Sequence, residues 1–396
     1  MSNHGPGSQS PRRRSVYSGS AKVGSGSASS PPRAPGGRGR TYGGGRIPPV
    51  RQATKARMIV LACLLVSVFA TIGGIGVWAY AKALNDDLDR FDAFEGLEDR
   101  PDETPGFNML VLGTDSRNPD SDDPSRADTI MLMHVPSTAD KAYIISLPRD
   151  LYVDVPAEGD WGGGETKLNS AQYHGGIPLM VNTVENYTGV FVDHVLQIDF
   201  DGLKEVVDAL GGIDMDIEEA TNPEYCLDSC AVWESIHKNP EGEYNNFEAG
   251  VEENMSGERA LDYVRQRYQF ADSDLSRMRH QQELLMAMMD KATTAGIVGN
   301  PGKMRSFLSS ITDAVTVDEK FNLIDTGLRF IDIRSDDLTF MTSPIAGTED
   351  RDGESVVIPD DEKAPDMYAA IAEDSLAGWL KENPDVAGED ETADGE

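Results

Sequence analysis

Three largely apolar runs, the first of them continuous, mark the start of the folded part of this 396-residue chain. Runs of this length that are bounded by turn residues are typical of buried strands. They are Phe107–Gly113, Asp128–Val135 and Lys141–Leu147. Only the short turn Pro136–Asp140 separates the last two runs, so we expect them to form a hairpin.

Helical and extended patterns alternate after this hairpin, which is typical of a single α/β domain. The first expected elements are a helix from about Asn169 to Tyr187, kinked at Gly175, Gly176 and Pro178, a strand at His194–Phe200, a helix at Gly202–Leu210 and a strand at Ile213–Ile217. A helix is then expected to begin at Ser256, followed by a helical region from Arg277 to about residue 333 with breaks near Gly296 and Pro301. The last expected elements are strands at Leu338–Met341 and Val356–Ile358 and a helix at Pro365–Leu380. A long irregular insertion is expected up to about Gly250.

Residues Met58–Tyr80 carry no charged side chain. At about 1.5 Å per residue, a helix of this length spans roughly 34 Å, which is enough to cross the hydrocarbon core of a bilayer. Basic residues precede the run, and Asp86, Asp87 and Asp89 follow it. The positive-inside rule therefore predicts a single-pass membrane protein with a cytoplasmic N-terminus and an extracellular domain.

Charge divides the chain into two parts. The first 57 residues hold eleven Lys and Arg and no acid, so the remainder holds 24 bases against 68 acids, a net charge of −44. The first part is rich in Gly, Ser, Pro and Arg and has few large apolar residues, so we expect it to be disordered. Its basic residues are suited to acidic lipid headgroups, but a disordered arm beside a membrane helix needs no such partner.

These patterns predict six segments. They are a disordered basic cytoplasmic segment at 1–57, a transmembrane helix at 58–80, an acidic extracellular stalk at 81–104, the main α/β domain at 105–345, a C-terminal strand and helix of the same domain at 346–382, and a disordered acidic tail at 383–396.

Cys226 and Cys230 are the two cysteines outside the apolar segment. Four positions separate them, so a disulfide that closes a local loop is the first interpretation. A zinc site is the alternative, and only His237 lies near enough in sequence to complete it.

The segment Glu258–Gln282 contains five arginines and no lysine within an acidic chain. The planar arginine side chain matches pairs of phosphate oxygens, so this pattern indicates an anion site. The alternative is a helix surface of Arg–Asp pairs, since acidic residues lie nearby. They are Asp262, Asp272 and Asp274.

Helix geometry limits how these arginines act together. Arg265 and Arg267 would point about 200° apart on a helix but share one face in an extended segment, so we expect the helix to end near Val264. Ser273 is a suitable N-cap for the next helix, on which Asp274, Arg277 and Gln281 share one face.

Two aspartates stand where α/β sheets place ligands. Asp115 follows the first apolar run and Asp128 begins the second, with Arg126 just before it. Each residue alone is also a common turn former or strand-end cap. Together with the arginines, they suit a Mg²⁺ ion whose coordination is completed by phosphate oxygens.

The helix after Ser273 also carries a row of apolar side chains. They are Met278, Leu285, Met286, Met288 and Met289. Such a row either packs in the core or forms an adaptable lining for a lipid chain, and the sequence leaves both open.

The chain resembles the LytR-CpsA-Psr family of membrane-anchored phosphotransferases, which attach glycopolymers to peptidoglycan. The resemblance rests on ordered motifs over about residues 105 to 300. They are N-M-L-V-L-G-T-D-S-R, S-R-A-D-T-I-M-L, I-I-S-L-P-R-D, T-K-L-N-S-A-Q-Y-H-G-G, I-D-F-D-G-L-K-E-V-V-D-A-L-G-G-I-D, and S-G-E-R-A-L-D-Y-V-R-Q-R with D-S-D-L-S-R-M-R-H-Q-Q. The resemblance implies an α/β/α sandwich with a central mixed sheet.

The resemblance also implies roles for individual residues. Asp115 and Asp128 would bind Mg²⁺ at the pyrophosphate of a polyprenyl-linked glycan donor. The residues implied to hold this pyrophosphate are Arg126, Arg149, Lys167, Asn169, Arg265, Arg267, Arg277 and Gln281. Those implied to act in catalysis are Arg149, Arg265, Arg267, Arg277 and Asp274, the last by orienting the arginines or the metal.

The implied reaction is attack of a peptidoglycan hydroxyl on the sugar-bound phosphorus, with release of polyprenyl phosphate. Such transfer depends mainly on positioning and charge neutralisation. Asp115 and Asp274 are the candidates for a general base, although none is required. The family often has an arginine where this chain has His280, which we expect to carry at most a partial charge.

Two other classes of function stay open at this point. A polyprenyl-pyrophosphate hydrolase, or a lipid-phosphate binding protein, would use the same site. A regulator that contacts nucleic acid is disfavoured, because a domain with a net charge of −44 repels the phosphate backbone.

Overall fold

The computed structural model describes residues 79–114, 127–217, 220–221, 247–266, 274–294, 301–330, 332–351 and 353–387. The basic segment, nearly all of the apolar run, Cys226 and Cys230 lie outside these ranges, so the expectations for them stay predictions. Within the ranges described, no helix is long and apolar enough to cross a bilayer.

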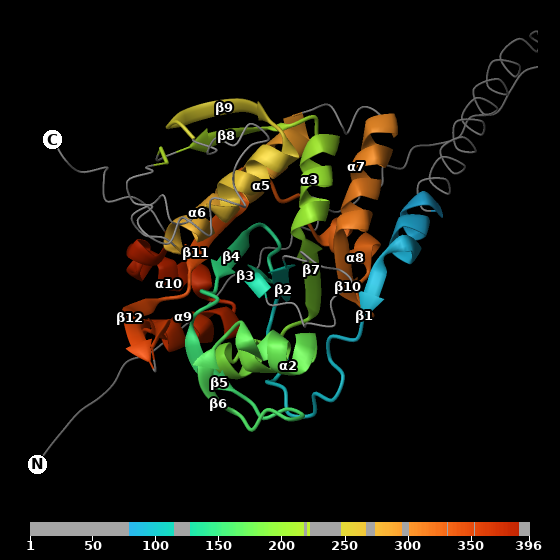
Figure 1. The fold of residues 1–396 in the computed structure, drawn as a ribbon. Helices are drawn as coiled ribbons and strands as arrows, with labels where there is room; N and C mark the ends of the chain where they lie inside the picture. Colours follow the sequence, from blue (N-terminus) through green and yellow to red (C-terminus); the bar gives the residue numbers. More distant parts are fainter. Residues whose placement is uncertain are drawn as a thin grey trace, which may run out of the picture. The chain divides into compact units, whose positions relative to one another are not determined.

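Seven strands form one central sheet, in the order β1-β10-β7-β2-β3-β4-β11 (Figure 1). Their bounds are Asp89–Phe91 (β1), Phe107–Thr114 (β2), Ala127–Val135 (β3), Ala142–Ser146 (β4), His194–Asp199 (β7), Val315–Asp318 (β10) and Leu338–Thr342 (β11). The sheet is mixed, because β2 pairs with β7 in parallel and with β3 antiparallel. The expected hairpin is confirmed by the antiparallel pairing of β3 with β4.

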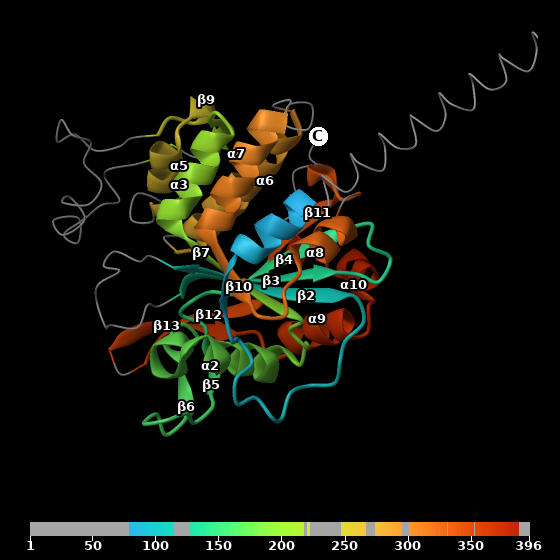
Figure 2. The ribbon, with the colours of Figure 1, turned by 90° about the vertical axis from the view of Figure 1, so that its right-hand side faces the viewer.

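Helices cover both faces of this sheet (Figure 2). On one face lie α2 (Ser170–Thr188), α9 (Lys363–Ala372) and α10 (Leu376–Glu382). On the other lie α3 (Phe200–Ala209), α5 (Gly257–Arg265), α6 (Asp274–Thr294), α7 (Pro301–Ala314) and α8 (Leu323–Arg329). Alternate residues of β2 serve the two layers: Leu110 and Leu112 join the core under α2 and α9, whereas Phe107 and Met109 join the opposite cluster. The α/β/α sandwich is therefore confirmed.

In the part of the chain that the structure describes, three two-stranded antiparallel sheets lie outside the central sheet. They are β5 (Tyr152–Val155) with β6 (Gly164–Lys167), β8 (Ile213–Ile217) with β9 (Gly250–Met255), and β12 (Ile345–Arg351) with β13 (Glu354–Pro359). The first follows the loop after β4, and a bridge between Leu151 and Val357 joins it to the third. These two hairpins therefore stand together beside the end of β4.

Several short elements differ from the expectations. β10 lies in a region expected to be helical, and β1, in the expected stalk, adds to the sheet beside it. The expected helix Pro365–Leu380 is two helices, because Asp374 adopts a left-handed conformation with φ of 56° after α9. Residues Pro384–Ala387 of the expected tail form the 3-10 helix η3, in which Val386 packs on the core.

Candidate active site

The strand ends that carry the predicted site meet at one edge of the sheet. Thr114, the last residue of β2, pairs with Ala127 at the start of β3 and with Asp199 at the end of β7. Asp115 and Arg126 are the chain neighbours of Thr114 and Ala127, and both lie outside the described residues. Their side-chain positions stay predictions, but the strands that lead to them are adjacent, as the sequence analysis required.

Asp128 and Arg149 form an ion pair at this edge. Arg149 Nη1 lies 2.5 Å from Asp128 Oδ1, and the two side chains are 19% and 30% exposed. Arg149 lies in the loop after β4. Its backbone carbonyl accepts a hydrogen bond of 3.0 Å from the backbone N–H of Asn169, which fixes the backbone of the loop at this residue. Since both side chains keep contact with solvent, the pair is accessible to a ligand.

Arg277 reaches the same strand from α6. Its side chain is 8% exposed, and Nη2 donates a hydrogen bond of 3.5 Å to the backbone carbonyl of Asp128. Gln281, one helical turn further, is buried on the same face. Asp128 thus contacts two arginines that come from different elements, and the three residues lie close together. Their role in binding a phosphate stays a prediction.

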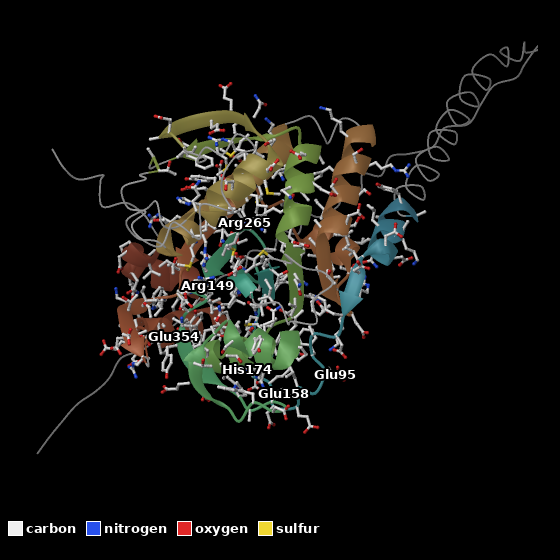
Figure 3. All side chains as sticks on the ribbon, in the orientation of Figure 1. Glu95, Arg149, Glu158, His174, Arg265 and Glu354 are labelled. Carbon is white, nitrogen blue, oxygen red and sulfur yellow. The ribbon has the colours of Figure 1, made fainter. Side chains whose placement is uncertain are left out.

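Arg265 is the last residue of α5. Ser256 caps this helix by accepting a hydrogen bond from the Arg259 backbone N–H, and Gln266 leaves it in an extended conformation with φ of −69° and ψ of 138°. The helix therefore ends one residue later than expected. Figure 3 shows Arg265 above Arg149 in the same view. Arg267 and Ser273 lie outside the described residues, as does the side chain of Asp274.

Aromatic stacking ties the end of α5 to the start of α6. The rings of Tyr263 and His280 have centroids 4.3 Å apart, and the Tyr263 hydroxyl donates to Glu283 at 3.0 Å. Burial lowers the pKa of His280 to about 3, and Arg279 beside it adds to this shift. His280 is therefore neutral near pH 7, which agrees with the expectation of at most a partial charge. It packs against Tyr263 and cannot replace an arginine as a cation.

Lys167 connects to Arg149 through a residue that the sequence analysis did not single out. Asp150 lies 3.4 Å from Arg149 Nε and 3.3 Å from Lys167 Nζ. Lys167 also lies 3.3 Å from Glu354 of β13. Asp150 follows Arg149 directly in one of the family motifs, so its position was available as a signal. No sequence signal marked Glu354, because only the packing of the β5–β6 hairpin against the β12–β13 hairpin brings it close to Lys167.

Asn169 has a backbone role in this structure. It stands at the N-cap position of α2, but its φ of −64° and ψ of −16° are helical and its side chain makes no capping hydrogen bond. Its N–H is bound to Arg149, as described above. The kink expected in this helix is confirmed at Gly175 and Gly176, which have non-helical angles.

The apolar side chains of α6 divide between core and surface. Met278 is buried and Met288 packs against the cluster formed by α3, α5 and β8, so the core interpretation is confirmed for these two. Met286 is 40% exposed. A lipid lining stays a prediction.

The described half of the proposed metal site fits Mg²⁺. Asp128 supplies a partly exposed carboxylate beside arginines, and magnesium prefers one or two carboxylates together with phosphate oxygens. No cluster of three metal-ligating side chains occurs in the part of the chain that the structure describes. A metal here would therefore depend on Asp115 and on a bound phosphate.

The fold and the arginines around Asp128 define an α/β domain with a candidate anion site at one edge of its sheet. Residues 79–373 match the LytR_cpsA_psr family, and the chain belongs to this family.

The chain is also similar to two named relatives and to one solved structure. A probable cell wall biosynthesis protein, LcpB of Corynebacterium glutamicum, is 33% identical over 79% of this chain and 69% of its own length. The polyisoprenyl-teichoic acid–peptidoglycan teichoic acid transferase TagT of Bacillus subtilis is 29% identical over 65% of this chain and 79% of its own length. The crystal structure of protein gbs0355 from Streptococcus agalactiae has the same fold, with a TM-score of 0.56 and 21% identity over 68% of this chain and 88% of that one.

Proposed function

We propose that this protein is a phosphotransferase that moves a glycopolymer from a polyprenyl-pyrophosphate carrier to a peptidoglycan hydroxyl, forming a phosphodiester bond. Membership of the LytR_cpsA_psr family supports a transferase of cell wall glycopolymers. The relatives named as a cell wall biosynthesis protein and as a teichoic acid–peptidoglycan transferase support the same donor and acceptor classes.

The observation that carries this proposal is the convergence of Arg149 and Arg277 on Asp128. Guanidinium groups match phosphate oxygens in pairs, so two of them on one strand end suit a pyrophosphate better than a single phosphate. As polyprenyl phosphate leaves, negative charge grows on the bridging oxygen, and fixed cations stabilise it without reorganisation. Asp128 and Asp150 hold Arg149 from two sides, which keeps its fork in one orientation.

A Mg²⁺ ion bound through Asp115 and Asp128 would neutralise further charge on the pyrophosphate. The prediction is that chelation abolishes transfer and that added magnesium restores it.

The proposal includes anchoring by the apolar run at 58–80, with the described domain outside the cell. The charge distribution supports it, because eleven basic residues precede that run and none of the first 57 residues is acidic. Labelling of single cysteines on either side of the run in intact cells would test the orientation.

A transfer assay with lipid-linked glycan and peptidoglycan tests the function itself. We expect glycan to become attached through a phosphodiester, whereas a hydrolase would release free glycan phosphate. Arg277→Lys keeps the charge but loses the fork, and we expect it to reduce transfer by about 100-fold. Arg305→Lys on the exposed surface of α7 is the matched control. Equal activity of the two variants would show that the arginine site does not serve the reaction.

A further inference from the structure

A groove of about 880 Å³ lies on the side of α6 away from Arg277. We call it the β11 groove, after the strand that forms its floor. From α6 it is lined by Arg279, Gln282, Glu283 and Met286, which are spaced i, i+3, i+4 and i+7 and so share one helical face. At about 100° per residue, this face is opposite to that of Arg277 and Gln281. The same helix therefore faces the candidate active site on one side and the groove on the other.

All five residues of β11, Leu338–Thr342, line the groove. In the part of the chain that the structure describes, β11 is the last strand at its end of the sheet and pairs only with β4. No described strand lies along its outer edge, although η3 packs near β11 and lines the same groove. Such an edge presents backbone N–H and C=O groups at the spacing that an extended peptide requires. The floor of the groove favours a peptide over a bare sugar or a lipid chain.

Charges of both signs stand along the groove walls. Arg279 and Lys363 supply positive charge, and Glu283, Asp360 and Asp385 supply negative charge. Lys363 and Asp385 form an exposed ion pair with each other, which a charged ligand would have to replace. An alkyl chain would have to lie against these charged groups and would gain little from burial there. A short peptide that carries both an amine and carboxylates complements both signs.

The groove lies near the proposed reaction. Gln282, on its wall, donates to the Ser146 hydroxyl at 2.9 Å, and Ser146 ends β4, the strand between β3 and β11. Two strand spacings of about 4.8 Å separate β3 from β11, and Thr342 at the end of β11 is level with Met131, three residues along β3 from Asp128. The near end of the groove floor is therefore roughly 14 Å from the candidate site. A glycan segment bound near Asp128 could therefore carry its attached peptide in the groove.

We propose that the β11 groove binds the stem peptide of the peptidoglycan acceptor and so selects glycan strands that carry peptides. This inference rests on the proposed function in taking peptidoglycan as the acceptor. The peptide would add beside β11 through backbone hydrogen bonds, with its charged ends against the groove walls. The groove would then position the acceptor hydroxyl, while the arginines hold the donor.

Direct binding to the full-length protein in detergent micelles tests this inference without requiring transfer. The probes are fluorescent peptidoglycan fragments with their peptides and the same fragments after the peptides are removed by an amidase. We expect the peptide-bearing fragments to bind at least about tenfold more tightly. Met286→Trp or Thr339→Trp, which fill the groove, should remove this difference. Leu328→Trp, at a 63% exposed position on α8, is the matched control.

The kinetics of transfer give a second measurement. Thr339→Trp should raise the KM for the peptide-bearing acceptor by about tenfold and leave kcat and the KM for the donor unchanged. Equal affinity for the two kinds of fragment, or an unchanged affinity in both groove variants, would overturn the inference. Dimers at the assay concentration that Thr339→Trp dissociates would also overturn it, since the groove would then hold a second copy of the chain.

The two proposals fail in different ways. Transfer that ignores both the peptide and the groove variants would leave the proposed function standing and remove the groove inference. Peptide-dependent binding without transfer to any acceptor would support the groove and remove the transferase.

Discussion

The Nη1 atom of Arg149 lies 2.5 Å from the Oδ1 atom of Asp128, which joins the loop after β4 to the second residue of β3. Neither side chain is fully buried, at 19% and 30% exposure. The stability gained from such a pair is small, because solvent screens it. Its position at the edge of the sheet, with Arg277 on the same residue, leads us to predict that it contributes to the site rather than to the stability of the fold.

Asp128→Asn tests this distinction. We expect the free energy of unfolding to change by about 1 kcal/mol or less, as for a partly exposed pair. Transfer should fall by about 100-fold or more, since a preorganised charged group at the reacting phosphate is lost. Asp154→Asn, at an exposed position of β5, is the control for both measurements. A large loss of stability together with retained transfer would show that the pair is structural.

The pH dependence of stability should follow two buried histidines. Burial lowers the pKa of His134 to about 4 and that of His280 to about 3, both below the unfolded value of 6.5. The unfolded chain therefore binds protons that the folded chain does not, and stability falls as the pH drops below about 6.5. Between pH 7 and pH 5 each histidine should lower the free energy of unfolding by about 2 kcal/mol.

His134→Gln isolates the contribution of one of these histidines to the pH dependence of stability. The ring of His134 faces the side-chain oxygen of Asn108 at 2.7 Å, and Asp374 lies 3.9 Å from its other nitrogen. Urea unfolding at pH 7 and pH 5 should show a pH difference smaller by about 2 kcal/mol in this variant. His174→Gln, at a partly exposed position, should keep the original difference. An unchanged pH difference in His134→Gln would show that this histidine is charged in the folded protein.

Long apolar runs and capped helices could be predicted from the sequence because they are specified locally. β2, β3 and β4 are largely apolar stretches, and Ser256 marked the start of α5. β1 and β10 are only three and four residues long, so they exist through pairing with strands far away in the chain. Packing, in the same way, determines that His280 is neutral and that Glu354 reaches Lys167. Tertiary contacts of this kind leave no local pattern to read.

Close contact between α3 and α5 positions the helix that carries Arg265. A Cβ atom at Gly257 would lie 2.2 Å from the backbone carbonyl oxygen of Lys204. Because this oxygen belongs to the backbone, it cannot rotate away as the end of a side chain could. Gly257→Ala should therefore push α5 away and destabilise the protein by about 3 kcal/mol or more. Gly378→Ala in α10 meets nothing within 4 Å and should be neutral or stabilise by up to about 1 kcal/mol. Urea unfolding compares the two variants, and equal stabilities would show that α5 can shift without cost.

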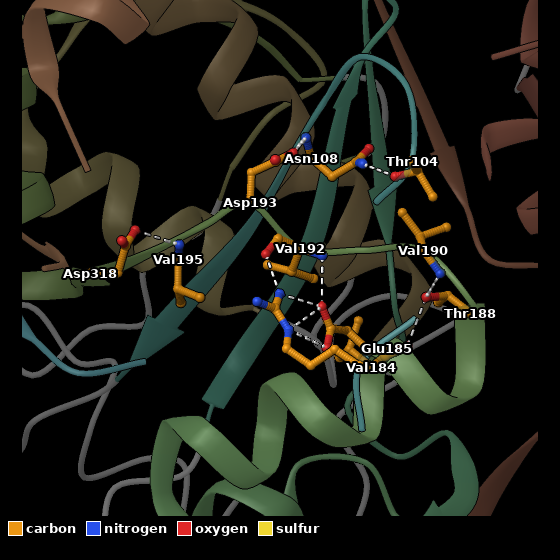
Figure 4. A network of polar contacts seen from close by, with 11 residues as sticks. Thr104, Asn108, Val184, Glu185, Thr188, Val190, Val192, Asp193, Val195 and Asp318 are labelled. Atoms are coloured by element: carbon orange, nitrogen blue, oxygen red, sulfur yellow. Dashed lines mark hydrogen bonds and ion pairs between the residues drawn. The ribbon is translucent and has the colours of Figure 1, made fainter. Parts of the chain in front are cut away.

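A buried ion pair fixes the segment before β2 to the domain. Arg100 donates to both carboxylate oxygens of Glu185, whose side chain is 1% exposed, and also to the carbonyl of Val192. Glu185 in turn accepts the Val192 backbone N–H at 2.8 Å, as Figure 4 shows. The guanidinium also lies 4.5 Å from the centroid of Phe94 and 3.9 Å from that of Phe191.

Arg100→Ala should be among the most destabilising substitutions outside the apolar core. It leaves the Glu185 carboxylate buried without its cation, which typically costs about 3–5 kcal/mol. Lys82→Ala is the matched control, because Lys82 and Asp86 form a pair that is 52% and 56% exposed and should contribute at most about 1 kcal/mol. In the double variant Arg100→Met with Glu185→Leu, no charge is left buried, so we expect most of the stability lost in Arg100→Ala to return. Urea unfolding of the four proteins measures this directly, and a double variant no more stable than Arg100→Ala would show that the hydrogen bonds to Val192 matter more than the charge.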